Sequence, residues 1–214
     1  MPRRNRVDPW GDLQSVSARG LFTGNRGCLV DDGGRLVRHH NGSLWITCFT
    51  SFRDWSHPLA APRTWTPLFF LDDAVALAAG HRPCGLCRRA DYLDYRQAVT
   101  ATLGRDRPVL ANELNRRLAA ERLRRGRGLE RRCDRILTER RLGELPSGTV
   151  VLAPGRTVPH ILVDRRLRPY MTERWGPAMA MAPSTTVDVL TTPTSVDALA
   201  NGFAPTLHPS ATEV

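Results

Sequence analysis

Two cysteines with a spacing suited to metal binding, Cys84 and Cys87, stand directly behind His81-Arg82-Pro83. A Cys-x-x-Cys pair lets two thiolates converge on one ion and supplies half of a tetrahedral zinc site. Redox chemistry of the thioredoxin kind would require a strand, helix and strand around the pair, and the sequence predicts no such unit. The pattern therefore favours zinc.

The other half of the zinc site must come from further along the chain. Cys48, at the end of the β-prone run Trp45-Ile46-Thr47, is the natural third ligand. Cys28 is the first choice for the fourth, because antiparallel neighbours could bring positions 28 and 48 together and four thiolates close a structural site. The alternatives, in order of preference, are His40, His39 and His57.

The composition is that of a globular protein. Of the 214 residues, 41% are hydrophobic and 24% charged, which is enough to bury a core in one or two domains. Five cysteines, an odd number with two in Cys-x-x-Cys, argue against a disulfide framework and favour a reducing cytoplasm. We expect no signal peptide, and no membrane-spanning helix, because no apolar run of sufficient length exists.

The charge predicts a polyanionic partner. The net charge is +10, and every basic residue is arginine, which contacts phosphate through two parallel hydrogen bonds. We therefore expect the protein to bind DNA or another nucleic acid by its backbone; the alternative is that the arginines only form solvated helix faces. The expected phosphate contacts are Arg82, Arg88, Arg89, Arg124, Arg125, Arg127, Arg131 and Arg132.

Short β-prone pieces precede the cysteine pair. Residues 1–20 form an N-terminal arm, after which Asp-Gly and Asn-Gly pairs indicate tight hairpins. The strands of the resulting antiparallel meander are expected at 27–31, 34–39 and 43–49.

A strand and two helices surround the cysteine pair. A buried strand over 68–71 leads to Asp72 or Asp73, either of which could cap a helix that ends at Gly80. A second helix is predicted over 84–103, closed by Gly104. These elements complete a zinc-stabilised domain over 21–104.

The second half of the chain has a different pattern. Apolar residues at spacings of three and four predict two arginine-rich helices, at 108–125 and 128–142, with Cys133 packed in the core. A small sheet follows, with strands near 149–152, 160–163, 167–171 and 187–190 and a short helix at 195–200. The whole is an α+β protein, with a second unit over 105–204 and a frayed tail over 205–214.

Residues 44–90 resemble a known zinc module. The run Leu68 to Arg89, LFFLDDAVALAAGHRPCGLCRR, is similar to the zinc-binding domain at the N-terminus of Ada DNA-repair proteins. That family combines a Phe-rich strand, an Ala-rich helix and an Arg-Pro-Cys-x-x-Cys motif. Cys48 takes the place of the family's first cysteine, while the family's second cysteine position is Phe52 here.

The resemblance implies a function as well as a metal. In the Ada family, a zinc held by four cysteines binds DNA non-specifically, and one ligand thiolate accepts the methyl group of a methylphosphotriester. The resemblance therefore implies a DNA-binding zinc protein that recognises or repairs alkylated phosphates, with Cys48 as the alkyl acceptor.

Two enzymatic alternatives use the same zinc. Pro83-Cys84-x-x-Cys87 is also half of the nucleobase-deaminase signature, but that chemistry needs an upstream His-x-Glu or Cys-x-Glu, and the first glutamate of the chain is Glu113. A zinc-dependent hydrolase, such as a nuclease or a nucleotide-acting enzyme, remains the open alternative. Its mark would be an exchangeable water on the zinc.

Overall fold

A six-stranded sheet contains the cysteine motif. The computed structural model describes residues 2–54, 61 and 63–213. The strands of this sheet are β1 (Arg6–Val7), β2 (Leu13–Gln14), β3 (Phe22–Asn25), β4 (Ile46–Phe49), β5 (Leu68–Phe70) and β6 (Arg82–Pro83). They lie in the order β2-β1-β5-β3-β4-β6.

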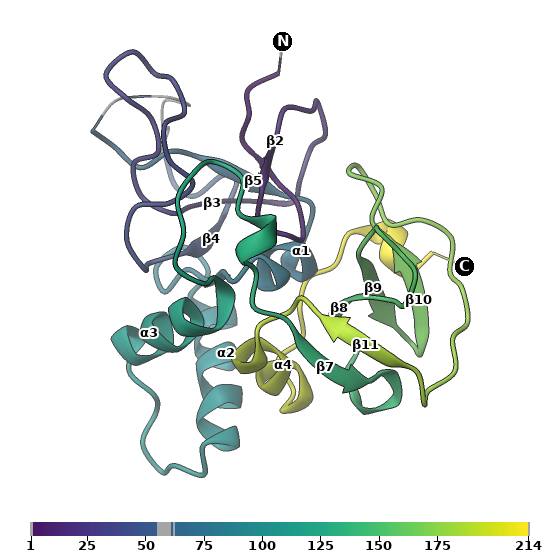
Figure 1. Cartoon of the computed structure of the whole chain (residues 1–214). Coiled ribbons are helices and arrows are strands. Elements are labelled where there is room, and N and C mark those ends of the chain that lie inside the picture. The colour runs from purple at the N-terminus through teal and green to yellow at the C-terminus, as the bar shows by residue number, and fades with distance from the viewer. Residues whose placement is uncertain (1, 55–60, 62, 214) are drawn as a thin grey trace.

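A second, five-stranded sheet forms the other side of the molecule (Figure 1). Its strands are β7 (Thr138–Arg141), β8 (Val150–Leu152), β9 (His160–Val163), β10 (Arg166–Pro169) and β11 (Thr186–Val189). The order is β10-β9-β8-β11-β7, with every pair antiparallel. The α+β class and the predicted small C-terminal sheet are thus confirmed.

Four helices accompany these sheets in the part of the chain that the structure describes. They are α1 (Asp73–Ala78), α2 (Arg89–Thr102), α3 (Ala111–Arg122) and α4 (Pro193–Ala200). Short 3-10 turns occur at Arg132–Asp134, Leu142–Glu144 and Pro209–Ala211. Figure 1 shows α1 between the two sheets, with α2, α3 and α4 grouped below it.

Helix α1 forms as its sequence predicts. The side chain of Asp72 caps it by accepting a hydrogen bond from Val75 N at 3.0 Å. Gly80 ends it with φ +85°, and a Cβ there would lie 3.0 Å from the side chain of Arg122. All six residues of the helix are buried, and the helix contacts β5 of one sheet and β8 of the other.

One hydrophobic core joins both halves of the chain. It combines Val7, Phe70 and Val75 with Ile161 and Leu190 from beyond the position where the sequence predicts a domain boundary. No helix among the described residues is long and apolar enough to cross a bilayer.

Of the three strands predicted for the antiparallel meander, only the one at 43–49 forms, as β4, and the meander as a whole is not present. The sheet is mixed, because β1 pairs in parallel with β5, and β4 in parallel with β6. Residues 27–31 and 34–39 form only an isolated bridge between Val30 and Leu36. Gly27, at φ +92°, ends the extended run of β3 early and leaves Cys28 in a loop.

The two ends of the described chain are better ordered than predicted. The N-terminal arm contributes β1 and β2, and Leu13 is buried at 1% exposure. The tail contains buried Ala211, and its Thr206 N donates to Asp73 Oδ2 at 2.9 Å. Both ends cover α1 and its sheet, so neither is a loose segment.

Two helix predictions need correction. Residues 128–142 form a 3-10 turn and β7, since Arg135 enters the interior and donates to the carbonyls of Ala78 and Leu190. Cys133 is exposed as a result. Helix α2 begins at Arg89, five residues later than predicted, because Cys84 N still donates to Thr47 O as part of the sheet.

Candidate metal centre

Strand pairing brings Cys48 and Cys84 together. Strands β4 and β6 run parallel, with Thr47 opposite Pro83. The next residue on each side, Cys48 after Thr47 and Cys84 after Pro83, is therefore a neighbour of the other. The amide of Cys84 donates to Thr47 O at 2.9 Å and extends this pairing by one residue. The first two thiols are therefore placed by the register of the sheet.

A tight turn adds the third thiol. Between Cys84 and α2 the chain folds back so that Arg88 N donates to Cys84 O, and Leu86 N points at the sulfur of Cys84 at 3.4 Å. The sulfur atoms of Cys48, Cys84 and Cys87 all lie within 4.8 Å of one another. Three thiols at this separation could hold a metal ion such as zinc, which confirms the grouping that the sequence predicts.

Hydrogen bonds prepare one of these thiols for ionisation. The hydrogen bond from the Cys48 thiol lowers the pKa of Cys84, and the amides of Leu86 and Cys87 act in the same direction. The same thiol contact raises the pKa of Cys48, with burial adding to the effect. One negative charge is thus favoured in the group before any metal binds.

A buried ion pair holds the turn against α1. The guanidinium of Arg88 donates to both carboxylate oxygens of Asp73, at 2.6 and 2.8 Å, and to Thr47 Oγ1 at 3.0 Å. Burial alone would lower the pKa of Arg88, but the hydrogen bonds and charge of Asp73 outweigh it and raise the pKa. Arg88 also lies 3.9 Å above the ring of Phe22, so the cysteine turn has little freedom to move.

The three thiols open on a cavity of about 760 Å³. Aromatic and aliphatic side chains form most of its wall, and Thr23, Asn25 and Thr50 are the other polar residues that line it. The described residues that line it include no carboxylate and no histidine. The lining residues are Thr23, Asn25, Ile46, Cys48, Phe49, Thr50, Phe52, Trp65, Pro67, Phe69, Cys84, Leu86 and Cys87. We call this space the cysteine cavity.

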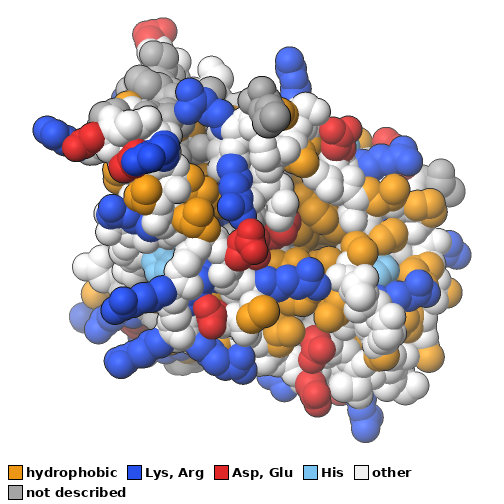
Figure 2. Space-filling model, turned by 45° about the horizontal axis from the view of Figure 1, so that its top comes forward, with side chains coloured by type: hydrophobic (Ala, Val, Ile, Leu, Met, Phe, Trp, Pro, Cys, Tyr) orange, Lys and Arg blue, Asp and Glu red, His pale blue; other side chains and the backbone are white. Residues whose placement is uncertain are grey.

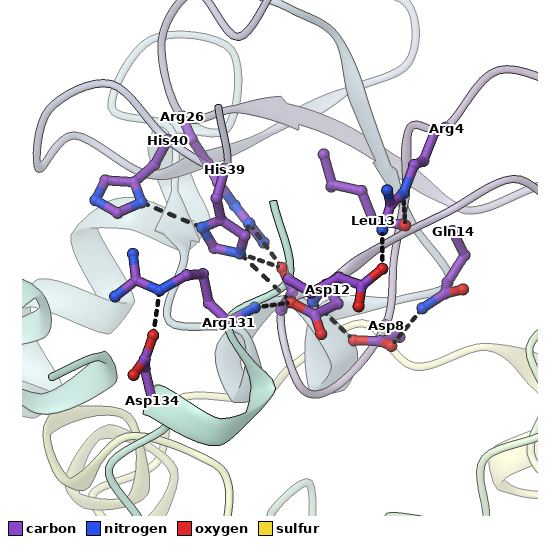
Figure 3. A network of polar contacts seen from close by, with 12 residues as sticks. Arg4, Asp8, Asp12, Leu13, Gln14, Arg26, His39, His40, Arg131 and Asp134 are labelled. Atoms are coloured by element: carbon purple, nitrogen blue, oxygen red, sulfur yellow. Dashed lines mark hydrogen bonds and ion pairs between the residues drawn. The ribbon is translucent and has the colours of Figure 1, made fainter. Parts of the chain in front are cut away.

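Of the four predicted fourth ligands, the three that the structure describes do not lie in this group. Cys28 lies in its loop with its thiol 3.5 Å from Val30 O. His39 is buried at 3% exposure, with Nε2 2.8 Å from Gly11 O, and Nδ1 of His40 lies 3.1 Å from Nδ1 of His39 (Figure 3). His57 lies outside the described residues.

Several arginines predicted to contact phosphate are interior. Arg82, Arg88 and Arg131 are 1–5% exposed, and Arg82 donates to Asn115 Oδ1 and to the carbonyl of Pro83. Arg82 and Arg88 thus bind groups of the fold itself and do not face a ligand at the surface. The exposed members of the predicted set are Arg89, Arg124, Arg125, Arg127 and Arg132.

The face drawn in Figure 2 is not continuously basic. Figure 2 shows arginine side chains separated by acidic and hydrophobic groups over the visible side. Part of the net charge of +10 lies inside the molecule, because Arg26, Arg122 and Arg135 are also buried. Net charge therefore overstates the charge available to a polyanion.

Sequence reasoning missed the side chains that surround the three thiols. Phe69 lines the cavity from β5, and the guanidinium of Arg6 lies 4.4 Å above its ring. Leu68 and Phe70 are fully buried, so Phe69 points to the other face of the strand, but the apolar run Leu68-Phe69-Phe70 gives no sign of this in the sequence.

Fold and site together define an α+β protein with a three-cysteine group suited to a metal ion. Compared with known proteins, the chain matches no family model, no curated protein and no solved structure. Its function must therefore be inferred from the site itself.

Proposed function

We propose that the protein binds zinc through Cys48, Cys84 and Cys87 and uses one of these thiolates to accept an alkyl group from an alkylated phosphate of DNA. The observation that carries the proposal is the chemistry of the cysteine cavity. Among its described lining residues, sulfur supplies the only ionisable groups. A reaction in this cavity has the thiolates as its nucleophiles.

The position of the three thiols supports a reactive centre. Among the described residues, three thiols meet at the wall of a cavity large enough for a substrate group. Zinc, when bound, would keep its ligand thiols deprotonated at neutral pH.

The transfer step needs no other reactant. The thiolate of Cys48, the residue that the family resemblance assigns to this role, would attack the methyl carbon of a phosphotriester. The S–C bond forms as the C–O bond breaks, and the phosphodiester oxygen leaves with the electron pair. The product is an S-methylcysteine, so the protein is consumed once per transfer.

The cysteine cavity and its rim suit a neutral methylated phosphate whose neighbouring phosphates are charged. A methylated phosphate has lost its charge and can enter the apolar cavity beside Phe49 and Phe69. The unmodified phosphates next to it keep theirs, and the exposed Arg89 lies two residues from Cys87 to meet them. Binding that depends on such contacts should weaken steeply as salt rises.

The test is a transfer assay with zinc-loaded protein. An oligonucleotide with one methylphosphotriester should add one methyl group to the protein, and peptide mapping should place it on Cys48. Cys48→Ser should abolish the transfer, while Cys133→Ser, which removes an exposed thiol elsewhere, should not. An unmodified oligonucleotide serves as the substrate control.

The same assay distinguishes alkyl transfer from the alternative function, hydrolysis. A three-ligand zinc also fits a hydrolase, because the fourth position could hold water. A hydrolase would release product repeatedly and leave the mass of the protein unchanged. Fully loaded protein that gains no methyl group would exclude alkyl transfer.

A further inference from the structure

A second cavity lies on the opposite face of the six-stranded sheet. Side chains alternate along a strand, so Trp45 points away from Ile46 and Cys48, which line the cysteine cavity. Trp45 instead lines a space of about 320 Å³. We call it the arginine cavity; it is formed by His40, Gly42, Ser43, Trp45, Ala119, Arg122, Leu123, Arg124, Arg125, Gly126 and Arg131.

Arg122 is the buried cation of this cavity. It lies at the end of α3 with 2% exposure, and its guanidinium is 4.0 Å above the ring of Trp45. Nε donates to Leu118 O at 3.0 Å and Nη2 to Ser43 O at 2.8 Å. Nη1 is buried and has no hydrogen-bond partner in the described structure. A charged donor left in this state is costly unless a ligand accepts its hydrogen bond.

Two more buried arginines add to this positive charge. Arg26 lies 4.2 Å from the ring of Trp45, and its Nη2 also has no described partner. Burial, and then the charge of neighbouring arginines, lowers the pKa of Arg26 and of Arg122 to about 9, and burial lowers that of Arg135 to about 10. No described carboxylate forms an ion pair with any of these three. Asp8 and Asp12 act on Arg26 and Arg135, and Glu121 acts on Arg122, only through charge at a distance, and burial outweighs them.

Further donors stand at the mouth of the cavity. Arg124 and Arg125 are exposed there, and Arg131 lines it while its Nε pairs with Asp134. Figure 3 shows the side chains of His40 and Arg131 directed to the same side, away from Asp8 and Asp12. Charged donors thus surround the space from the inside to the rim.

We propose that the arginine cavity binds a single phosphate group. Its side chains offer charged N–H donors to a ligand rich in acceptors, and arginine matches the geometry of phosphate oxygens. The volume is small, and Trp45 is 2% exposed, so it offers no face on which a base could stack. The phosphate comes either from a free phosphate ion or from the terminal phosphate of a nucleic acid.

Calorimetry and thermal unfolding with inorganic phosphate test this site. Phosphate should bind and raise the melting temperature, whereas chloride at equal ionic strength should not. Arg122→Gln should weaken binding about tenfold or more, because a charged hydrogen bond is lost. Since that variant also loses contacts to Leu118 and Ser43, Arg125→Gln at the exposed rim provides a second measurement. It should weaken binding several-fold and leave the unliganded melting temperature unchanged.

A matched control removes the same charge elsewhere. Arg116 is exposed on α3 and does not line the cavity, so Arg116→Gln should bind phosphate like the wild type. Equal shifts with phosphate and chloride, or an equal loss in Arg116→Gln and Arg125→Gln, would overturn the proposal.

A competition arm identifies the source of the phosphate. A short oligonucleotide with a 5′-phosphate that displaces inorganic phosphate, where the unphosphorylated one does not, would indicate nucleic-acid ends. Displacement by neither oligonucleotide, with tight binding of inorganic phosphate, would indicate the free ion. Cys48→Ser should bind phosphate normally, so this site and the proposed alkyl acceptor can fail separately.

Discussion

Two faces of one sheet carry opposite chemistry around β4. On one side Ile46 and Cys48 line a cavity whose only described ionisable groups are thiols. On the other, Trp45 lies against the guanidinium groups of Arg26 and Arg122. Thiolates suit a soft metal ion, and guanidinium groups suit a phosphate oxygen. A strand with a side-chain period of two can serve both sites and still keep a layer of backbone between them.

The largest effect on ligand binding is expected when one thiol of the cysteine cavity is removed and the arginine cavity is left intact. Cys84→Ser removes a central ligand, so zinc affinity should fall by more than the roughly 10–100-fold that altering a supporting residue costs. Phosphate binding in the arginine cavity should persist. Metal analysis of wild type, Cys84→Ser and the exposed control Cys133→Ser checks this, and equal zinc in all three would contradict the metal centre.

The second largest effect is expected from loss of the buried ion pair that holds the cysteine turn. Asp73→Asn leaves the charge of Arg88 buried without its partner and should lower the free energy of unfolding by about 3–5 kcal/mol. Asp91→Asn removes the half-exposed partner of the same arginine and should cost about 1 kcal/mol or less. Denaturant titration measures both, and similar losses would mean that Asp73 does not anchor the turn.

The buried histidine beside the arginine cavity should make the stability of the protein depend on pH. Burial, and then the charge of Arg26, lower the pKa of His39 from its ordinary value of 6.5 to about 2. Below pH 6.5 the unfolded chain binds a proton that the folded chain does not, so stability falls with falling pH. Between pH 7.5 and 5 this loss should amount to about 2 kcal/mol.

His39→Gln isolates this contribution. Glutamine can keep the donor to Gly11 O but cannot take up the proton, so the variant should be less sensitive to acid than the wild type by that amount. Any effect of acid on the thiols is common to both proteins. Parallel stability curves from pH 7.5 to 5 would show that His39 is not the group responsible.

The smallest effect is expected at Cys28. Its thiol lies outside the three-cysteine group, so Cys28→Ser should leave both the zinc content and the number of sulfur ligands unchanged. X-ray absorption at the zinc edge counts these ligands. A fall from four sulfurs to three would restore the four-cysteine site that the sequence first suggests.

Local signals in the sequence predicted the centre of the fold. The cap at Asp72, the break at Gly80 and the Cys84-x-x-Cys87 spacing each act within a few residues, and each is present in the structure. Cys48 was also correctly grouped with this pair. Such features depend on short-range geometry, which a single sequence displays directly.

Long-range partners explain what the sequence could not show. Arg88 was expected at the surface, because nothing near it indicates that Asp73 would neutralise it in the interior. Arg122 likewise ends beside Ser43, 79 positions away. The helix predicted at 128–142 is absent for the same reason. Arg135 points into the interior, where it donates to the carbonyls of Ala78 in α1 and of Leu190 just after β11. Burial of a charge depends on contacts that spacing along the chain does not reveal.

The tail contacts of α1 have a consequence for how the protein matures in the cell. Asp73 holds Arg88 and also accepts from Thr206 N, while the neighbouring Asp72 accepts from His208 N at 3.0 Å. The support of the cysteine turn is therefore incomplete until residues 206–208 have left the ribosome. A chain that is still being synthesised already contains its three thiols. The turn that holds them gains its full support, and the thiols their full affinity for a metal ion, only after residues 206–208 have been made and released.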